Sequence, residues 1–284
     1  MKFSLWTQYG ALNSKPVFDA FAHSLMTAGH TVVRNDNSSD VDVIWSVLWH
    51  GRMAQNKAIW DRAKLQSKPV IVLEVGGIKR GITWKVGLNG INRNAFWGDT
   101  GNDDSRANSL GLKLKSWKTD GEVILLCGQH ERSEQWQEMP RMSNWVMDII
   151  EKIRIHTNRS ILFRPHPRCP LPYIEHEFKN VRRQDPVKIN GTYDDFDMSF
   201  RNVHATISYS SNPGIHSILE GVPAFVGPAS LAYDAANDID FLHDIENPLR
   251  PDRQQWLNDY AWTEYTIEEI AQGIPLKRLT SKLF

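Results

Sequence analysis

Glu74 is the residue best suited, by type and position, to act as a general base. It is the only Glu in the first 118 residues, and it closes the apolar run Val70-Ile-Val-Leu73, which reads as a buried strand. Partial desolvation of a carboxylate at a strand end raises its pKa toward the range of a base. The alternative is a carboxylate that pairs with Lys79 or Arg80. We predict Glu74 as the catalytic residue.

A glycine turn after a second apolar run suits a phosphate ligand. Gly128 opens the turn, where the absence of a side chain lets the backbone approach a phosphate. Arg132 and Ser133 add hydrogen-bond donors, and Gln129 belongs to the same turn. The turn lacks the Gly-x-x-x-x-Gly-Lys pattern of a Walker A loop, so a plain solvated loop is the alternative.

A rigid histidine segment follows the next predicted strand. Two prolines fix the backbone on both sides of His166, and Arg164 and Arg168 flank them. A fixed imidazole between two guanidinium groups suits an anionic or nucleotide ligand. A structural turn is the alternative.

A predicted helix start carries three more candidate ligand-binding residues. Ser210, Ser211 or Asn212 is expected to cap a helix that has Pro213 at its first position. A helix N-terminus lined with hydroxyls binds anions, and Glu220 further along the helix is suited to accept both hydroxyls of a ribose. The alternative is ordinary capping with an exposed Glu.

Several familiar site patterns are missing. The sequence has no Gly-x-Gly-x-x-Gly dinucleotide fingerprint and no Gly-x-Ser-x-Gly elbow. Its ten His show no zinc spacing, and we predict no obligate metal.

The elements that must position these residues alternate between strand and helix. Apolar runs of strand type begin near residues 2, 31, 41, 70, 123, 160, 205 and 224, and helical spacing follows in residues 16–28, 53–65, 142–155 and 212–220. This alternation is typical of parallel sheets with helices on both faces. We expect an α/β fold of two Rossmann-like domains with a cleft between them, residues 1–118 and 119–284. The final helix either stays with the second domain or packs back on the first.

Composition narrows the class of protein. Hydrophobic residues make up 41% and charged residues 23%, which argues against a disordered, fibrous or membrane-spanning chain. The two cysteines cannot form a disulfide framework, and the first residues lack the apolar run of a signal peptide. We predict a cytoplasmic protein, in the host cytoplasm if viral, with no membrane partner.

The neutral total charge hides two halves of opposite sign. Residues 1–118 hold 16 Lys and Arg against 9 Asp and Glu, whereas residues 119–284 hold 17 against 24. The first half also contains seven of the 11 Trp. Basic surfaces attract phosphodiesters and aromatic rings stack on bases, so residues 78–97 are the candidate DNA contact. Its candidate acceptor-binding residues are Lys79, Arg80, Trp84, Lys85, Arg93 and Trp97.

The second half resembles the donor domain of GT-B glycosyltransferases, in particular the bacterial capsule polysaccharide transferases. The resemblance covers about residues 160–235. It rests on Phe163-Arg-Pro-His-Pro167, on Ser210-Ser211, and on Leu219-Glu-Gly-Val-Pro223 followed by Gly227-Pro-Ala-Ser-Leu-Ala-Tyr233. In that family the His-Pro segment and the Ser-Ser loop are taken to bind the sugar nucleotide. The resemblance implies that His166, Ser210, Ser211 and Glu220 hold the donor, a UDP- or CMP-sugar.

The layout of the first half is similar to that of phage DNA glucosyltransferases, which are also GT-B enzymes. There an acidic residue closes a strand after a Lys-rich helix end and acts as base, and residues 64–74 fit this layout. In those enzymes a glycine turn with an Arg, after the first strand of the second domain, binds the diphosphate. Residues 127–133 of this chain are similar.

Together these features predict an inverting glycosyltransferase that transfers a sugar to a 5-hydroxymethylpyrimidine, such as 5-hydroxymethylcytosine, in bacteriophage-type DNA modification. A transferase that extends a capsular or cell-surface glycan is the first alternative. A nucleotide-sugar epimerase is the second, and a non-enzymatic nucleotide-binding module in which Glu74 is structural is the third. The sequence leaves the oligomeric state open.

Overall fold

The chain forms two compact units, each built from separate segments. The computed structural model describes residues 1–191 and 195–283. The first unit comprises Met1–Asn102, Arg132–Glu134 and Asp259–Phe284, and the second comprises Asp103–Glu131 and Gln135–Asn258. Residues 103–118 thus lie in the second unit and residues 259–283 in the first, while the acceptor and donor roles of the units remain predictions.

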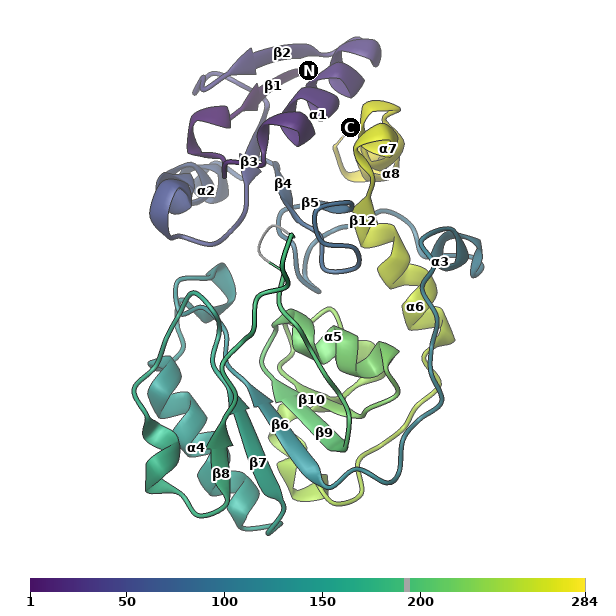
Figure 1. The fold of residues 1–284 in the computed structure, drawn as a ribbon. Helices are drawn as coiled ribbons and strands as arrows, with labels where there is room; N and C mark the ends of the chain where they lie inside the picture. Colours follow the sequence, from purple (N-terminus) through teal and green to yellow (C-terminus); the bar gives the residue numbers. More distant parts are fainter. Residues whose placement is uncertain (192–194, 284) are drawn as a thin grey trace. The chain divides into compact units, whose positions relative to one another are not determined.

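The first unit contains a six-stranded sheet in the order β12-β5-β4-β3-β1-β2 (Figure 1). Its strands are β1 (Lys2–Leu5), β2 (Thr31–Arg34), β3 (Val41–Trp45), β4 (Val70–Val75), β5 (Trp84–Leu88) and β12 (Glu264–Tyr265). Strands β1 to β4 are parallel, as predicted, whereas β5 is antiparallel to both β4 and β12. The antiparallel edge lies outside the sequence prediction, because residues 78–118 are rich in Gly and Asn and show weak periodicity.

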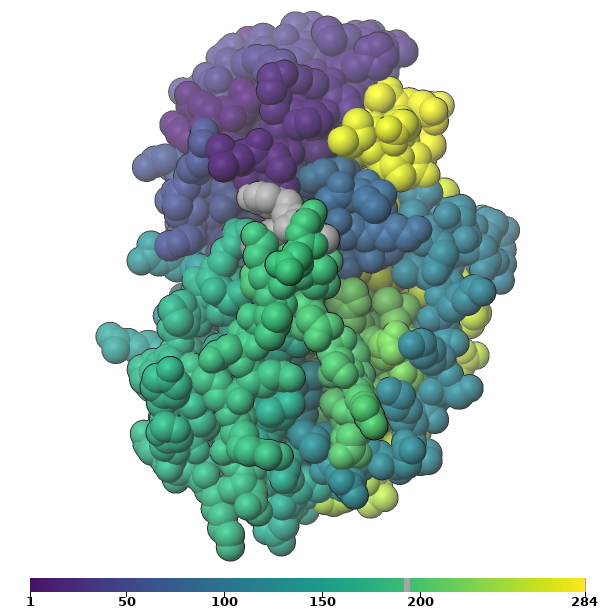
Figure 2. All heavy atoms as spheres, viewed as in Figure 1, coloured from purple at the N-terminus to yellow at the C-terminus, as the bar shows by residue number. Residues whose placement is uncertain are grey.

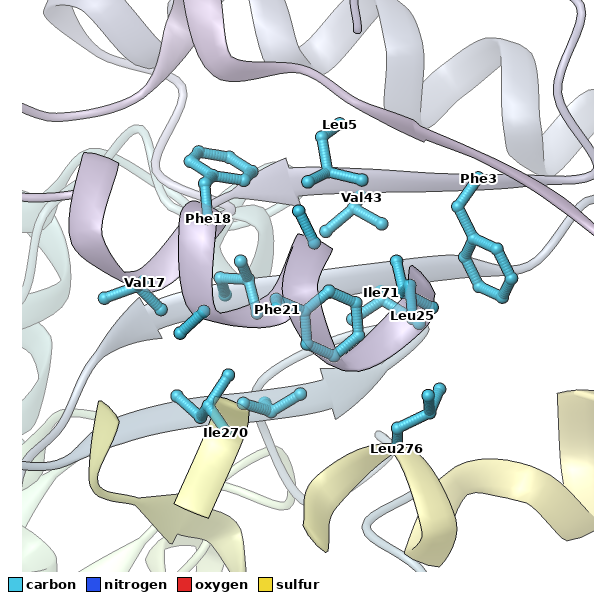
Figure 3. Packing of buried hydrophobic residues seen from close by; sticks show 14 of the residues in the cluster. Phe3, Leu5, Val17, Phe18, Phe21, Leu25, Val43, Ile71, Ile270 and Leu276 are labelled. Atoms are coloured by element: carbon cyan, nitrogen blue, oxygen red, sulfur yellow. The ribbon is translucent and has the colours of Figure 1, made fainter. Parts of the chain in front are cut away.

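Four α-helices of the first unit flank this sheet. They are α1 (Lys15–Thr27), α2 (Asn56–Leu65), α7 (Ile267–Ala271) and α8 (Ile274–Leu283). In α1 the buried Phe18, Phe21 and Leu25 recur at helical spacing and pack against strand residues such as Val43 (Figure 3). Ile270 of α7 and the Leu residues of α8 join the same cluster. The C-terminal residues therefore lie beside the N-terminal ones (Figure 2).

The second unit contains a six-stranded parallel sheet in the order β11-β10-β9-β6-β7-β8. Its strands are β6 (Val123–Cys127), β7 (Ser160–Arg164), β8 (Val181–Arg183), β9 (Val203–Ser208), β10 (Ala224–Val226) and β11 (Asn237–Asp238). The chain leaves β6 toward β7 on one side and later returns to β9 on the other. The carboxyl ends of β6, β7 and β9 therefore surround a topological switch point, where parallel sheets bind ligands.

Helices α4 (Met142–Arg154) and α5 (Asn212–Leu219) pack on opposite faces of the second sheet, which gives the Rossmann-like layering. The second unit also contains α3 (Ser105–Ser109) and the start of α6 (Gln254–Tyr260), which ends in the first unit. Trp145, Ile149 and Ile153 of α4 form an apolar stripe on one face of the sheet. Short 3-10 turns occupy Thr7–Tyr9, Gly51–Gln55, Glu134–Trp136, Ile174–Glu177, Tyr233–Ala235, Ile239–Asp244 and Ala261–Thr263. No helix in the described ranges is both long and apolar enough to cross a membrane.

Candidate functional site

The loops after β6 and β9 meet through a buried glutamine. Gln129 is 5% exposed, and its Oε1 accepts hydrogen bonds from the backbone N and the Oγ of Ser210, each at 3.0 Å. Gly128 donates its backbone N–H to the carbonyl of Arg164 at 2.9 Å. A Cβ at Gly128 would lie 3.5 Å from the backbone N of His166, so the loops after β6 and β7 are also close. The structure thus brings together three predicted donor-site segments, those after β6, β7 and β9.

Two imidazole rings lie beside this contact. The rings of His130 and His166 have centroids 5.5 Å apart and are nearly perpendicular. His166 Nδ1 accepts a hydrogen bond from the backbone N–H of Arg168 at 3.1 Å, which fixes the ring orientation. The Arg168 side chain is exposed. His130 had no assigned role at the sequence level, although it lies in the predicted glycine turn.

The start of α5 presents hydroxyls that the fold itself does not use. Ser211 is the N-cap residue and has extended backbone, but its side chain makes no capping bond. Within the described part of the chain, Ser211 Oγ and the Oγ of the fully buried Ser208 have no hydrogen-bond partner. Asn212 is the first helical residue. Buried polar atoms without a partner call for a specific explanation, and a ligand at this helix start supplies one.

Two predicted donor residues in the second unit have structural partners. Arg164 is buried and donates to the backbone carbonyl of Asp197. Glu220 is the C-cap of α5, so about 12 Å of helix separates it from the helix start. Its carboxylate lies 2.7 Å from Lys115 Nζ. The structure therefore does not bring Glu220 to Ser211.

Arg132 and Ser133 lie in the first unit. The backbone N of Trp49 donates to the Arg132 carbonyl at 2.8 Å, and Ser133 forms a β-bridge with Leu48. Glu134 accepts hydrogen bonds from Trp49 Nε1 at 3.1 Å and Trp60 Nε1 at 3.0 Å. Lys64 Nζ lies 2.6 Å from the same carboxylate. This three-residue segment is thus anchored within the first unit.

Glu74 is partly exposed and lies in a cross-strand row of charges. Its Oε1 accepts from the backbone N of Val75 at 2.8 Å. Lys85 is its partner in β5, and Glu264 is the partner of Lys85 in β12. Burial lowers the pKa of Lys85, whereas the neighbouring Glu264 and Glu74 act in the opposite direction. The cross-strand neighbour of Glu74 is therefore Lys85.

Glu264 anchors the turn between β4 and β5. Its carboxylate accepts from Gly77 N at 2.6 Å, Ile78 N at 3.0 Å and Thr83 Oγ1 at 2.7 Å. The carboxylate also raises the pKa of Tyr260, for which burial is the larger cause. The turn that follows the predicted base is therefore fixed from the C-terminal segment.

The predicted acceptor-binding residues are dispersed between core and surface. Trp84 is 4% exposed and lies 5.8 Å from Trp45, and Lys85 is 5% exposed. Trp97 is partly buried and donates its Nε1–H to the Asn92 carbonyl. Lys79 and Arg93 are exposed, and Arg80 is partly buried.

Most of the tryptophans in residues 1–118 belong to the core. Five of the seven are buried, namely Trp6, Trp45, Trp49, Trp60 and Trp84. A buried indole offers no face to a base. The abundance of Trp in this half therefore reflects packing and gives no support to DNA binding.

No metal-binding cluster occurs in residues 1–191 and 195–283, where no group of three or more His, Cys, Asp or Glu is suitably placed.

Sequence reasoning also missed Tyr209 and Gly227, which shape the loops after β9 and β10. Tyr209 stacks edge-on against Trp136 at 5.2 Å, and burial raises the pKa of its hydroxyl. A Cβ at Gly227 would lie 2.5 Å from the Tyr209 ring, so only glycine fits there without a shift. The sequence signal for Gly227 was its place in Gly227-Pro-Ala-Ser-Leu-Ala-Tyr233, one of the segments that resemble the capsule transferases.

Comparison with solved structures identifies proteins of similar fold. No family model and no curated protein matches the sequence. Among solved structures, the chain is similar to the beta Kdo 2,7 transferase of Thermosulfurimonas dismutans KpsC, with a TM-score of 0.54, 15% identity and coverage of 98% of this chain and 100% of that one. The beta Kdo 2,4 transferase of the same KpsC has a TM-score of 0.47 at 12% sequence identity, over 97% of this chain and 98% of that one. The structure of S. aureus MnaA with UDP has a TM-score of 0.37 at 10% sequence identity, over 100% of this chain and 97% of that one.

The first of these matches spans both units and confirms the predicted two-domain Rossmann-like GT-B fold. The resemblance to capsule polysaccharide transferases holds at the level of the fold. The resemblance to phage DNA glucosyltransferases stays a prediction.

Proposed function

We propose that this protein is a glycosyltransferase that uses a nucleotide sugar. The observation that carries the proposal is the carboxyl edge of the second sheet. There Gln129 joins two loops through Ser210, and the His130 and His166 rings lie 5.5 Å apart. At the start of α5 the buried Ser211 hydroxyl has no partner among the residues that the structure describes. Helix N–H groups, hydroxyls and imidazoles stabilise the negative charge that develops on a leaving phosphate.

In the proposed reaction, Glu74 removes the proton of an acceptor hydroxyl. The hydroxyl oxygen forms a bond to the anomeric carbon as the bond from that carbon to the phosphate oxygen breaks. The electron pair leaves with the nucleotide, and the proton stays on Glu74. Direct displacement of this kind inverts the anomeric centre. Lys85 is the cross-strand neighbour of Glu74 in β5, and burial lowers its pKa.

A glycan is the acceptor favoured by the side-chain positions. The DNA hypothesis depended on stacking tryptophans and a basic loop. Trp84 and Lys85 are buried, so neither is presented on the surface for a duplex. The fold likeness to a beta Kdo transferase points the same way.

Nucleotide binding is the first test. Calorimetric titration with UDP and CMP is expected to show binding of at least one, and Ser211→Ala is expected to weaken it about fivefold through loss of a hydrogen bond. Ser143→Ala, in the first turn of α4, is the matched control and should leave binding unchanged. If neither nucleotide binds, the proposal is refuted.

Product analysis then separates the reactions. The protein is incubated with UDP- and CMP-sugars and with an oligosaccharide mixture or hydroxymethylated DNA, and products are identified by mass. Sugar transfer to an oligosaccharide, abolished in Glu74→Gln with nucleotide affinity intact, supports the proposal. Transfer to DNA restores the DNA hypothesis, and an epimerised donor without acceptor identifies an epimerase. Unchanged turnover in Glu74→Gln removes the assigned base.

A further inference from the structure

Two exposed apolar side chains lie on one surface of the second unit. Ile155 directly follows α4 and is 77% exposed, and Phe241, in the 3-10 turn Ile239–Asp244, is 53% exposed. Ring contacts join their two segments. The His243 ring centroid lies 5.6 Å from that of Phe241 and 6.3 Å from that of His156. Large apolar side chains gathered on an exposed surface mark a site of interaction with another molecule.

This surface lies at the edge of the second sheet opposite to the candidate donor site. Residues 155–159 lead into the amino end of β7. His204, near the amino end of β9, donates from Nε2 to the Ile245 carbonyl at 2.7 Å, which places that segment at the same edge. The donor-site loops instead follow the carboxyl ends of β7 and β9. We call residues 152–159 and 238–246 together the amino-edge surface.

A hollow of about 480 Å³ opens on this surface, lined by residues 154–159 and Glu246. Its charged groups are already bonded to the protein. Glu246 accepts from Arg159 Nε at 2.9 Å and from Thr157 Oγ1, and Arg154 donates to the Arg159 carbonyl at 2.8 Å. A polar ligand therefore gains few new ionic bonds here, whereas an aromatic side chain gains buried area and contact with guanidinium groups.

The two segments of the amino-edge surface carry charges of opposite sign. Residues 152–159 contain three Lys or Arg and no Asp or Glu, whereas residues 238–246 contain four Asp or Glu and no Lys or Arg. A surface that carries both signs is complementary to a second copy of itself turned about a two-fold axis. The basic residues are Lys152, Arg154 and Arg159, and the acidic residues are Asp238, Asp240, Asp244 and Glu246.

From these features we propose that the amino-edge surface is the interface of a two-fold symmetric homodimer, in which Phe241 of each copy enters the hollow of the other copy. His156 lines the hollow, so the exposed ring and the hollow lie only two ring contacts apart. A two-fold axis makes each such contact twice, once in each direction. Each basic segment then faces the acidic segment of the other copy. The inference is independent of the proposed function.

Sedimentation velocity of the full chain, from about 1 to about 200 µM, is the first test. A monomer–dimer equilibrium is expected in this range. Phe241→Ala is expected to raise the dissociation constant of the dimer about 30-fold, as truncation of a central aromatic residue does in other interfaces. Leu65→Ala is the matched control, because it removes an exposed apolar side chain from the first unit, and it should leave the dissociation constant unchanged.

Exchange of charges tests the arrangement of the two segments. Asp244 and Lys152 are both exposed, so Asp244→Lys and Lys152→Glu are expected to fold normally. Each variant alone should dimerise about tenfold more weakly than the unmodified chain. An equimolar mixture should recover the dimer, because one copy then carries more positive charge and the other more negative charge on the surfaces that meet.

Photo-crosslinking locates the contact. With p-benzoylphenylalanine at position 241, in a mixture of isotope-labelled and unlabelled chains, crosslinks between copies are expected at residues 154–159, as read by peptide mass. The inference is overturned by a chain that stays monomeric throughout the concentration range, by open-ended association, by a dimer that Phe241→Ala leaves unchanged, or by crosslinks between copies that all lie elsewhere. Nucleotide titration of Phe241→Ala separates the two proposals, because a monomer that binds nucleotide refutes only the dimer, and a dimer that binds none refutes only the proposed function.

Discussion

Replacing Glu134 by Ala is expected to destabilise the first unit strongly. The carboxylate accepts from two indole N–H groups, those of Trp49 and Trp60, and lies 2.6 Å from Lys64 Nζ. Both indoles are buried, so water cannot readily replace the lost acceptor. The substitution therefore leaves two buried donors unpaired.

The magnitude follows from these contacts. A buried donor that loses its acceptor costs about 1–3 kcal/mol, so two indoles cost about 2–6 kcal/mol. Lys64 adds about 1 kcal/mol or less, because its side chain is 57% exposed. Glu134 itself is 24% exposed, which lets some water reach the gap and favours the lower half of the range. We expect about 3 kcal/mol, or about 10 °C in Tm for a unit of this size.

Thermal unfolding followed by tryptophan fluorescence measures the effect, since Trp49 and Trp60 report on the first unit. Glu138→Ala, an exposed acidic residue four positions on, is the control and should leave Tm unchanged. In a double-mutant cycle, Glu134→Ala and Trp60→Phe are expected to be less than additive by about 1–2 kcal/mol. A Glu134→Ala protein with the Tm of the unmodified chain would refute the assigned role of the indole bonds.

Three further outcomes are expected. His204 donates to the Ile245 carbonyl and burial lowers its pKa, so the unfolded chain binds the extra proton below pH 6.5. As the pH is lowered below 6.5, the contribution of His204 should reduce the free energy of unfolding by up to about 1.4 kcal/mol per pH unit. Urea titrations at several pH values measure this free energy, and His204→Gln should lack this contribution. Burial raises the pKa of Cys127 to about 12, so iodoacetamide at pH 8 should label Cys169 and spare Cys127, as read by peptide mass. Gly227→Ala is expected to displace the Tyr209 ring and to weaken nucleotide binding about tenfold. A nucleotide affinity equal to that of the unmodified chain would show that this ring does not contribute to the site.

The parts of the fold that could be predicted are those with local periodicity. Strands β3, β4 and β6 are mostly apolar runs, and α1 and α4 show apolar residues at helical spacing. Strands β5 and β12 could not be found in this way. β5 contains the buried Lys85, and β12 is two residues long and contains the buried Glu264. The two charged residues are cross-strand partners, although their strands lie far apart in the sequence.

In the candidate site, too, local patterns predicted some residues correctly, whereas contacts between distant segments could not be predicted. Gln129 and Ser210 were both expected at the donor site, and their hydrogen bond brings together loops that are 81 residues apart. Arg132 was expected beside them, but the adjacent Glu134 pairs with indoles in the first unit. Spacing along the chain gives no information about such a distant partner. Unpaired buried atoms, such as the Oγ of Ser211, are likewise visible only in a structure.

The segmented make-up of the first unit reverses the usual order in which domains are completed during synthesis. Domains generally fold from the N-terminus as the chain leaves the ribosome. Here the edge strand β12 and the Glu264 carboxylate that fixes the turn after β4 arrive more than 180 residues after that turn. All segments of the second unit, which ends at Asn258, have by then been made. All residues of the second unit are therefore synthesised before β12, the strand that covers the open edge of β5.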